Sequence, residues 1–159
     1  MTLLEAEGYL VKGWHMTPDA PYYAQFANWL ERYRRAWIER NAADAGELFT
    51  EDAIYREQPF QTPFIGRAAI QRYWATVTAT QSEIEMRYGP MIVADHHMAV
   101  EWWVNLRNGG SPITLVGEFF LLFTDGGRCR ELREYWAVTE GRVEPPDWWE
   151  DSVGSESSS

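Results

Sequence analysis

Two glutamates and one tyrosine are the residues in this sequence that best suit proton-transfer chemistry. Tyr55 and Glu57 lie two positions apart in the segment FTEDAIYREQPF, and Glu134 lies between Leu132 and Trp136 in a later apolar run. Because side chains alternate along a strand, Tyr55 and Glu57 would share one face, and Glu134 would share the apolar face of its own strand. Burial raises the pKa of a carboxyl group, and two acids in one cavity can divide into a base and an acid.

These residue types favour three roles: a general base at Glu57, a general acid or water-holding group at Glu134, and an orienting donor at Tyr55. The alternative is structural. Glu57 would then pair with a basic residue at the rim of a cavity, and Glu134 would close a local hydrogen-bond network. The residues themselves leave both interpretations open.

Three helices are predicted in the first half of the chain. Apolar residues recur at helical spacing over residues 22–41, opposite arginines and glutamates, which predicts an amphipathic helix. A short second helix is expected over residues 44–49, with Asp44 as its cap, and a third over residues 66–81. Between them, a strand over residues 53–57 carries the first tyrosine and glutamate, and prolines stop it.

The rest of the domain alternates between apolar and polar residues, as strands do. Strands are predicted over residues 83–88, 91–94, 98–107, 113–124 and 128–138. Short turns join them, so an antiparallel meander is expected, with a bulge at Gly89-Pro90. Helices followed by such a sheet predict an α+β domain whose helices cover one face of the sheet.

Aromatic side chains are expected to converge on the covered face of the sheet. Any one of them is explained by core packing, but their number favours a cavity for a flat or hydrophobic ligand. The predicted ligand-binding residues are Trp37, Phe60, Trp74, Trp102, Val104, Phe119 and Trp136.

The opposite face of the sheet also carries large apolar residues. Trp103, Phe120 and Tyr135 are too apolar for open solvent, which predicts a homodimer formed through the outer faces of two sheets. Trp148 and Trp149 follow two prolines and are expected to fold back over the sheet or over the partner.

Length and charge narrow the class of protein. The 159 residues suit one domain, expected at 22–139, between an N-terminal arm at 1–21 and an acidic, Ser-rich tail at 140–159. The net charge of −10, half of it in the tail, argues against nucleic acid or an acidic membrane surface as a partner.

Cys129 is the one cysteine, so neither a disulfide framework nor a two-cysteine metal motif is expected. The first residues lack the pattern of a signal peptide, and no apolar run approaches the roughly 18 residues of a membrane helix. A cytoplasmic protein is therefore expected. His96-His97 is expected in a hairpin turn rather than a metal site, and no cofactor is predicted.

Three segments in this order carry a family resemblance: FTEDAIYREQPF after two helices, GRAAIQRYW at the start of the third, and FTDGGRCRELREYW on the last hairpin. Over residues 22–139 the chain resembles the nuclear transport factor 2-like superfamily, and more narrowly its SnoaL-like group, which includes polyketide cyclases, ketosteroid isomerase and limonene epoxide hydrolase. The resemblance implies a cone in which a strongly curved antiparallel sheet wraps around three helices and leaves a deep pocket. Homodimers are common in this superfamily.

The likeness to ketosteroid isomerase supports one position and fails at two others. Its general base follows the Ala of an Asp-Asp-Ala turn by four residues, and the same count from Ala53 gives Glu57. Its first-helix tyrosine falls near Ala36 or Trp37, and its second acid falls at Phe119. A steroid isomerase is therefore disfavoured, because donors for an enolate oxygen are missing.

The likeness to limonene epoxide hydrolase is similarly partial. Its Tyr-x-Asn-x-Pro stretch resembles residues 55–59, and its Arg-Asp-Tyr-Phe stretch, which carries a catalytic Asp, resembles residues 133–136. Its Arg-x-Asp pair falls on Trp102 and Val104, so this chemistry is disfavoured too. Both comparisons retain one pocket faced by the two glutamates and Tyr55.

Three functions follow as hypotheses. The first is a cofactor-independent cyclase, isomerase or hydratase or hydrolase-like enzyme acting on a hydrophobic metabolite. The second is a non-catalytic binder of a small hydrophobic ligand. The third is a dimeric interaction module, which predicts a shallow, filled cone.

Overall fold

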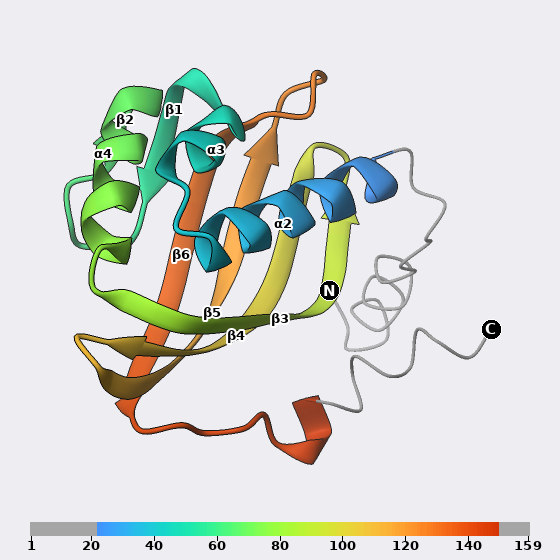
Figure 1. Ribbon diagram of the computed structural model, residues 1–159. Helices are drawn as coiled ribbons and strands as arrows, with labels where there is room; N and C mark the ends of the chain where they lie inside the picture. Colours follow the sequence, from blue (N-terminus) through green and yellow to red (C-terminus); the bar gives the residue numbers. More distant parts are fainter. Residues whose placement is uncertain (1–21, 150–159) are drawn as a thin grey trace.

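Helix α2 (Tyr23–Ile38) lies across the concave face of a curved sheet in the computed structural model, which describes residues 22–149 (Figure 1). Its buried stripe follows the predicted spacing and consists of Phe26, Trp29, Leu30, Tyr33 and Ala36. The helix ends earlier than expected because the chain turns at Arg40, where φ is +55°.

Two shorter helices flank the first strand. Helix α3 (Ala42–Glu47) begins at Asn41, whose side chain accepts a hydrogen bond from the backbone N–H of Asp44 at 3.1 Å. Asn41, and not Asp44 as predicted, is therefore the cap. Helix α4 (Arg67–Thr78) begins after Gly66, as expected, and its buried residues include Ile70 and Trp74.

The described residues form one sheet with the strand order β2-β1-β6-β5-β4-β3. Its strands are β1 (Phe49–Arg56), β2 (Phe64–Ile65), β3 (Gln81–Ala94), β4 (His97–Asn108), β5 (Ser111–Phe123) and β6 (Cys129–Glu140). The meander from β3 to β6 is antiparallel, as predicted, and the pairing of β3 with β4 shifts register between Tyr88 and Met91, where the bulge was expected.

The expectation of a wholly antiparallel sheet is wrong at one pair of strands. Strand β1 pairs with β6 in parallel, with Tyr55 opposite Leu132. The chain between the two strands forms α4 and the rest of the meander, and a connection of that length brings a strand back in the same direction. This pairing places Tyr55 beside the strand that carries Glu134.

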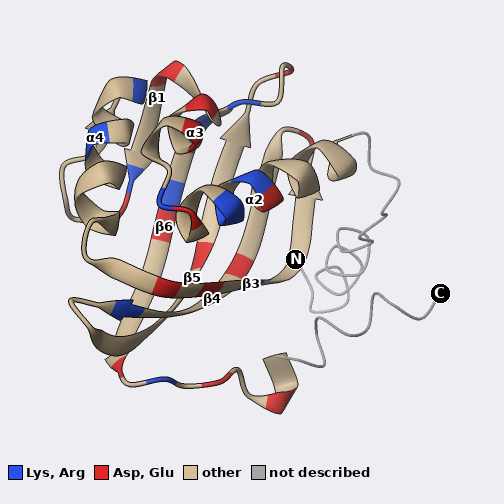
Figure 2. Cartoon of the chain, in the orientation of Figure 1, with Lys and Arg blue, Asp and Glu red and all other residues tan. Residues whose placement is uncertain are grey.

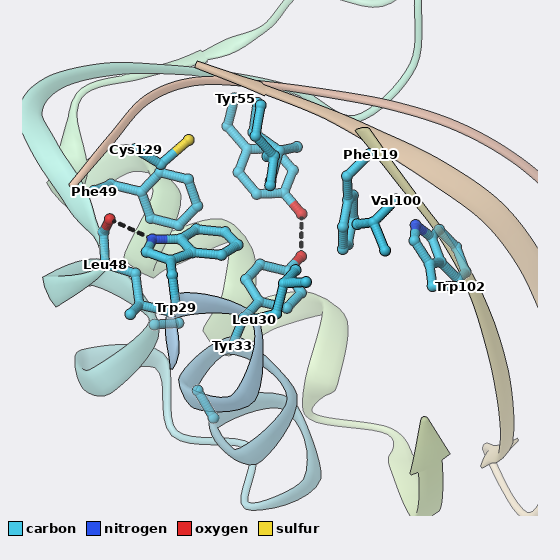
Figure 3. Packing of buried hydrophobic residues seen from close by; sticks show 14 of the residues in the cluster. Trp29, Leu30, Tyr33, Leu48, Phe49, Tyr55, Val100, Trp102, Phe119 and Cys129 are labelled. Carbon is cyan, nitrogen blue, oxygen red and sulfur yellow. Dashed lines mark hydrogen bonds between the residues drawn. The ribbon is translucent and has the colours of Figure 1, made fainter. Parts of the chain in front are cut away.

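The assignment of faces on β4 and β5 is confirmed. Val100, Trp102, Val104 and Leu106 are buried beneath the helices, whereas Glu118 faces outward and is exposed. Around them the core is densely aromatic. Figure 3 shows Trp29 donating a hydrogen bond to the Leu48 carbonyl at 2.9 Å, and the Tyr33 and Tyr55 hydroxyls meeting beside Phe119.

Residues 141–149 return along the outer face of the sheet (Figure 1). The indole N–H of Trp103 donates a 2.9 Å hydrogen bond to the Val143 carbonyl, and the Trp149 ring lies 6.0 Å from the Trp103 ring. Residues 141–149 therefore cover Trp103, which is not available to the predicted dimer face. Phe120 and Tyr135, the other two residues of that face, are exposed. The predicted arm at 1–21 and the end of the predicted tail, 150–159, lie outside the described residues.

Acidic and basic positions are interspersed over the helices and the sheet (Figure 2). None of the described helices is long and apolar enough to cross a membrane. Within residues 22–149, no group of three or more His, Cys, Asp and Glu side chains is placed to hold a metal ion. His96 lies in the turn between β3 and β4 and bonds to Asp125 at 2.6 Å.

Candidate functional site

A cavity of about 290 Å³ lies between the inner face of the sheet and helices α2 and α4. Its lining is mostly aromatic and aliphatic, with a small group of polar side chains, a composition typical of small-molecule sites. The lining residues are Tyr33, Trp37, Tyr55, Glu57, Tyr73, Trp74, Val77, Thr78, Gln81, Trp102, Asn108, Ile113, Leu115, Glu134, Trp136 and Val138.

Glu134 and two phenols form a buried polar cluster in this cavity. Tyr55 donates a hydrogen bond to Oε1 of Glu134 at 2.5 Å, and the Tyr33 hydroxyl lies 3.3 Å from the same oxygen. The two hydroxyls are 2.9 Å apart. The three residues come from β6, β1 and α2, so the cluster exists only when all three elements are packed together.

Burial controls the ionisation of this cluster. It raises the pKa of Glu134 to about 8; the hydrogen bond from Tyr55 opposes the rise, and the nearby Glu57 carboxylate adds to it. Burial and the charge of Glu134 also hold the phenol pKa values of Tyr33 and Tyr55 well above their usual range. Glu134 therefore carries its proton over most of the neutral pH range, while both phenols act as donors.

Glu57 is a second acidic residue on the cavity wall, and it lies just beyond the end of β1. Its side chain is half-buried, and its backbone carbonyl accepts a 3.1 Å hydrogen bond from the Trp136 indole. Tyr73, from α4, faces both acids: burial raises its pKa, and so do the charges of Glu134 and Glu57 and a hydrogen bond to Glu57. The cavity thus holds two differently exposed carboxyl groups, each with phenol neighbours.

Indole rings at steep angles form much of the wall. The Trp37 ring centre lies 6.4 Å from that of Trp74 and 6.2 Å from that of Trp102, at interplanar angles of 67° and 73°. Trp37 is fixed by a 2.7 Å hydrogen bond to Oε1 of Gln81. The buried indole nitrogens of Trp74 and Trp102 have no hydrogen-bond partner within the described part of the chain.

The cavity opens toward the hairpin between β4 and β5 and the end of β6. Val138 and Asn108 line it and are both exposed, whereas Tyr33 and Tyr55 are almost inaccessible. Polar chemistry therefore lies at the closed end, and a ligand would enter past aliphatic side chains.

Seven of the ten predicted site residues line this cavity: Tyr55, Glu57, Glu134, Trp37, Trp74, Trp102 and Trp136. Phe60 does not, because the turn after β1 carries it into solvent, where 99% of it is exposed. Val104 and Phe119 are fully buried but do not reach the space. Phe119 packs behind the lining, with its ring 5.1 Å from Tyr33 and 5.5 Å from Trp102.

The sequence analysis missed the phenols of Tyr33 and Tyr73 as polar members of the site. Both lie in helical stripes that were interpreted only as packing surfaces. The available signal was a phenol within an otherwise apolar stripe, since a buried tyrosine hydroxyl usually has a hydrogen-bond partner. Tyr33 supplies a hydroxyl from the first helix, one turn before the position expected from ketosteroid isomerase.

Cys129 takes no part in this site. It is fully buried next to β1, and burial raises the pKa of its thiol. A thiol in that state is a poor nucleophile, so the structure gives Cys129 a packing role.

Comparison with known proteins places the fold in a family. The model of the SnoaL-like domain matches residues 30–132. No curated protein sequence shows a significant match to the chain.

Solved structures of low sequence identity share the fold. SalBIII, described as an epoxide hydrolase/cyclase-like enzyme in pyran ring formation in the polyether salinomycin, is 18% identical, with a TM-score of 0.64 over 72% of this chain and 95% of that one. An LEH-like epoxide hydrolase of Mycobacterium tuberculosis is 13% identical, with a TM-score of 0.62 over 72% and 84% of the two chains.

A hypothetical protein of Catenulispora acidiphila with a ketosteroid isomerase-like fold, solved in complex with trimethylamine, is 18% identical, with a TM-score of 0.61 over 79% of this chain and 92% of that one. At these identities the likeness concerns the fold alone. The family match covers most of the domain from α2 to β6, and it agrees with the curved sheet and the helices on its concave face. The chain belongs to the SnoaL-like domain family, within the nuclear transport factor 2-like superfamily.

Proposed function

We propose that the protein is a cofactor-independent cyclase or isomerase that transfers protons within this cavity, with Glu134 as general acid and Glu57 as general base. The observation that carries the proposal is the 2.5 Å hydrogen bond from Tyr55 to Glu134, at the closed end of a largely apolar cavity. A carboxyl group held there keeps its proton near neutral pH and is ready to donate it.

The reaction that suits two such acids is an intramolecular substitution in which the leaving oxygen remains part of the same molecule, as in the opening of an epoxide. A substrate hydroxyl attacks an electrophilic carbon, Glu57 takes the hydroxyl proton, and Glu134 gives its proton to the oxygen that leaves that carbon. One C–O bond forms and one breaks, so the product is an isomer of the substrate. Water in place of the substrate hydroxyl would make the same step a hydrolysis. Solvent then restores the proton of Glu134 and removes that of Glu57.

The remaining polar residues orient the reacting groups. Tyr55 and Tyr33 both contact Oε1 of Glu134, so they hold that carboxyl in one direction, and the indole walls exclude water from a bound substrate. The solved relative that acts in pyran ring formation supports a ring-closing reaction in this fold. The substrate body would be apolar, to match the walls.

The test uses a panel of epoxy-alcohols, with ring closure monitored by liquid chromatography and mass spectrometry. Once a substrate is converted, Glu134→Gln and Glu57→Gln should each reduce turnover on the order of 10²- to 10⁴-fold. Glu118→Gln is the matched control, because it removes the same charge from the outer face of the sheet. Unchanged turnover in either cavity variant would refute the role assigned to that residue.

Binding without catalysis is the second candidate. The cavity and the fixed Trp37 ring favour a preformed ligand site, and a solved relative is in complex with the small molecule trimethylamine. A pure binder would retain its ligand in Glu57→Gln and convert no member of the panel. Recovery of a bound compound by native mass spectrometry would identify its ligand.

A further inference from the structure

The two cavity acids have other partners than the six described acids that pair with arginines on the surface. Carboxylates on the surface pair with arginines, as in Glu31–Arg34, Glu85–Arg142 and Glu131–Arg133. Glu134 is bonded to Tyr55 and Tyr33, and Glu57 lines the same cavity as Tyr73. Across residues 22–149, no salt bridge to either acid is found.

The charged side chains of the cavity lining are all acidic. The lining contains two glutamates, and among the described residues that form it there is no arginine, lysine or histidine. An ionised carboxylate here therefore has no cationic side chain of the lining to pair with. A ligand cation would supply what surface arginines supply elsewhere in the domain.

The aromatic walls add a second attraction for a cation. Four indoles and three phenols line the cavity, and the faces of such rings carry negative electrostatic potential. Trp37 is steeply inclined to Trp74 and Trp102, and Tyr33 lies 5.0 Å from Trp74 at 87°. Rings set in different directions around one space are the arrangement that binds ammonium groups, and tryptophan is the strongest of them.

We propose that the cavity binds a ligand that carries an ammonium group on an apolar body, with the ammonium held by the indoles of Trp37, Trp74 and Trp102 beside Glu57 and Glu134. This substrate class rests on the proposed function, because it describes the same cavity. An anionic ligand would be repelled by the Glu57 carboxylate, and by Glu134 as well once that residue ionises. A wholly neutral one would leave the Glu57 carboxylate without a counter-charge.

The test compares two probes of the same shape. Choline carries a quaternary ammonium, and 3,3-dimethylbutan-1-ol has carbon in place of that nitrogen. Isothermal titration calorimetry on the full chain at pH 7 should give an affinity for choline on the order of tenfold higher than for the neutral alcohol. Neither probe titrates in this range, so a difference in affinity reports the charge of the ligand.

Variants test which side chains cause the preference for choline over the neutral alcohol. Glu57→Gln should lower the affinity for choline severalfold and leave the affinity for the alcohol unchanged. Trp37→Leu should also weaken choline more than the alcohol, since it removes one aromatic wall. Glu118→Gln, on the outer face, should change neither affinity, and circular dichroism of each variant verifies folding.

The proposal is overturned if the alcohol binds as tightly as choline, or if choline shows no binding at 20 mM, a concentration of the order that a cage of this kind should saturate. Failure here is distinct from failure of the proposed enzyme. If the charge preference is absent while Glu134 still titrates near pH 8, acid-base chemistry stands and the ligand is neutral. If the preference is present while Glu57→Gln and Glu134→Gln leave turnover unchanged, the ammonium ligand stands and the acid and base roles of the two glutamates are wrong.

Discussion

Tyr55 and Glu134 lie on adjacent parallel strands, and their side chains meet in a 2.5 Å hydrogen bond at the closed end of the cavity. The bond favours the ionised carboxylate, whereas burial favours the protonated acid. Burial prevails, and the pKa of Glu134 rises to about 8. The pKa of Glu134 therefore lies close to neutral pH, where an acid can both give and regain a proton.

Tyr55→Phe should raise the pKa of Glu134 further, because it removes the hydrogen bond that most lowers that pKa. Carbon-detected NMR of ¹³C-labelled glutamate, titrated in the ligand-free protein, measures the value. Tyr33→Phe serves as the comparison and should produce a smaller rise, because its contact is 3.3 Å. An unchanged or lowered pKa in Tyr55→Phe would show that the phenol does not stabilise the carboxylate.

The raised pKa also predicts how stability depends on pH. Glu134 ionises near 4.5 in the unfolded chain and near 8 in the folded one. Between these values the folded state holds more protons, so the free energy of unfolding falls as pH rises, by at most about 1.4 kcal/mol per pH unit. The contribution is fully present below pH 4.5 and is lost as pH passes through 8.

Urea unfolding at pH 5, 6.5 and 8 tests this dependence. Glu134→Gln cannot ionise, so its stability relative to the wild type should improve steadily toward pH 8. Glu118→Gln, which is exposed, should follow the wild-type curve. A difference between wild type and Glu134→Gln that stays constant with pH would contradict the assignment.

How far sequence predicts this site depends on the type of residue. Glu134 stood out because one acid interrupts an otherwise apolar strand face, a pattern that burial confirms. Tyr33 did not, because phenols are ordinary in a helix stripe and only tertiary packing brings its hydroxyl to Glu134 from 101 residues away. The prediction that Phe60 lines the cavity is wrong for a local reason, because the alternation of apolar and polar residues does not encode the direction of a turn after a strand.

The fold was more predictable than the contacts across it. Helical and strand periodicities gave the order of elements, because each periodicity reflects which face is buried. The parallel pairing of β1 with β6 and the covering of Trp103 by residues 141–149 are both long-range contacts. No local pattern specifies such contacts, so the dimer face based on Trp103 could not be corrected from sequence.

Trp149→Ala should destabilise the domain by about 3 to 5 kcal/mol, because a tryptophan that is 1% exposed leaves a large void when truncated. Its neighbour provides the control: Trp148 is 66% exposed, and Trp148→Ala should change stability by less than about 0.5 kcal/mol. Urea unfolding followed by circular dichroism measures both. Equal, small losses of stability in the two variants would mean that residues 141–149 do not pack on the sheet in solution.

Gly117→Ala should narrow the cavity and destabilise the sheet. An added Cβ would lie 2.7 Å from Cζ2 of Trp102 and 2.5 Å from the Tyr135 carbonyl oxygen, so backbone as well as a ring must move. The expected loss of stability is about 1 to 3 kcal/mol. Gly126→Ala is the control, because its nearest contact would be an ordinary 3.8 Å. Equal stability of the two variants would contradict the close packing at Gly117.

Choline affinity should rise between pH 6 and pH 9. Glu134 is faced by Tyr33 from α2, Tyr55 from β1, Tyr73 from α4 and the Glu57 carboxylate beyond β1. The three phenols have raised pKa values and stay neutral over this range, so ionisation of Glu134 near pH 8 adds a negative charge to the cavity. Because choline keeps its charge at every pH, its affinity follows that ionisation, and calorimetry at half-unit intervals traces it.

Glu134→Gln separates this effect from any other titration in the protein. The variant should bind choline with an affinity that is nearly flat from pH 6 to pH 9, at about the level of the wild type at pH 6. Protons released on binding, measured in buffers of different ionisation enthalpy, should be largest for the wild type near pH 7 and absent in the variant. A rise in affinity that persists in Glu134→Gln would assign the effect to another group, and a flat wild-type curve would place the ammonium away from Glu134.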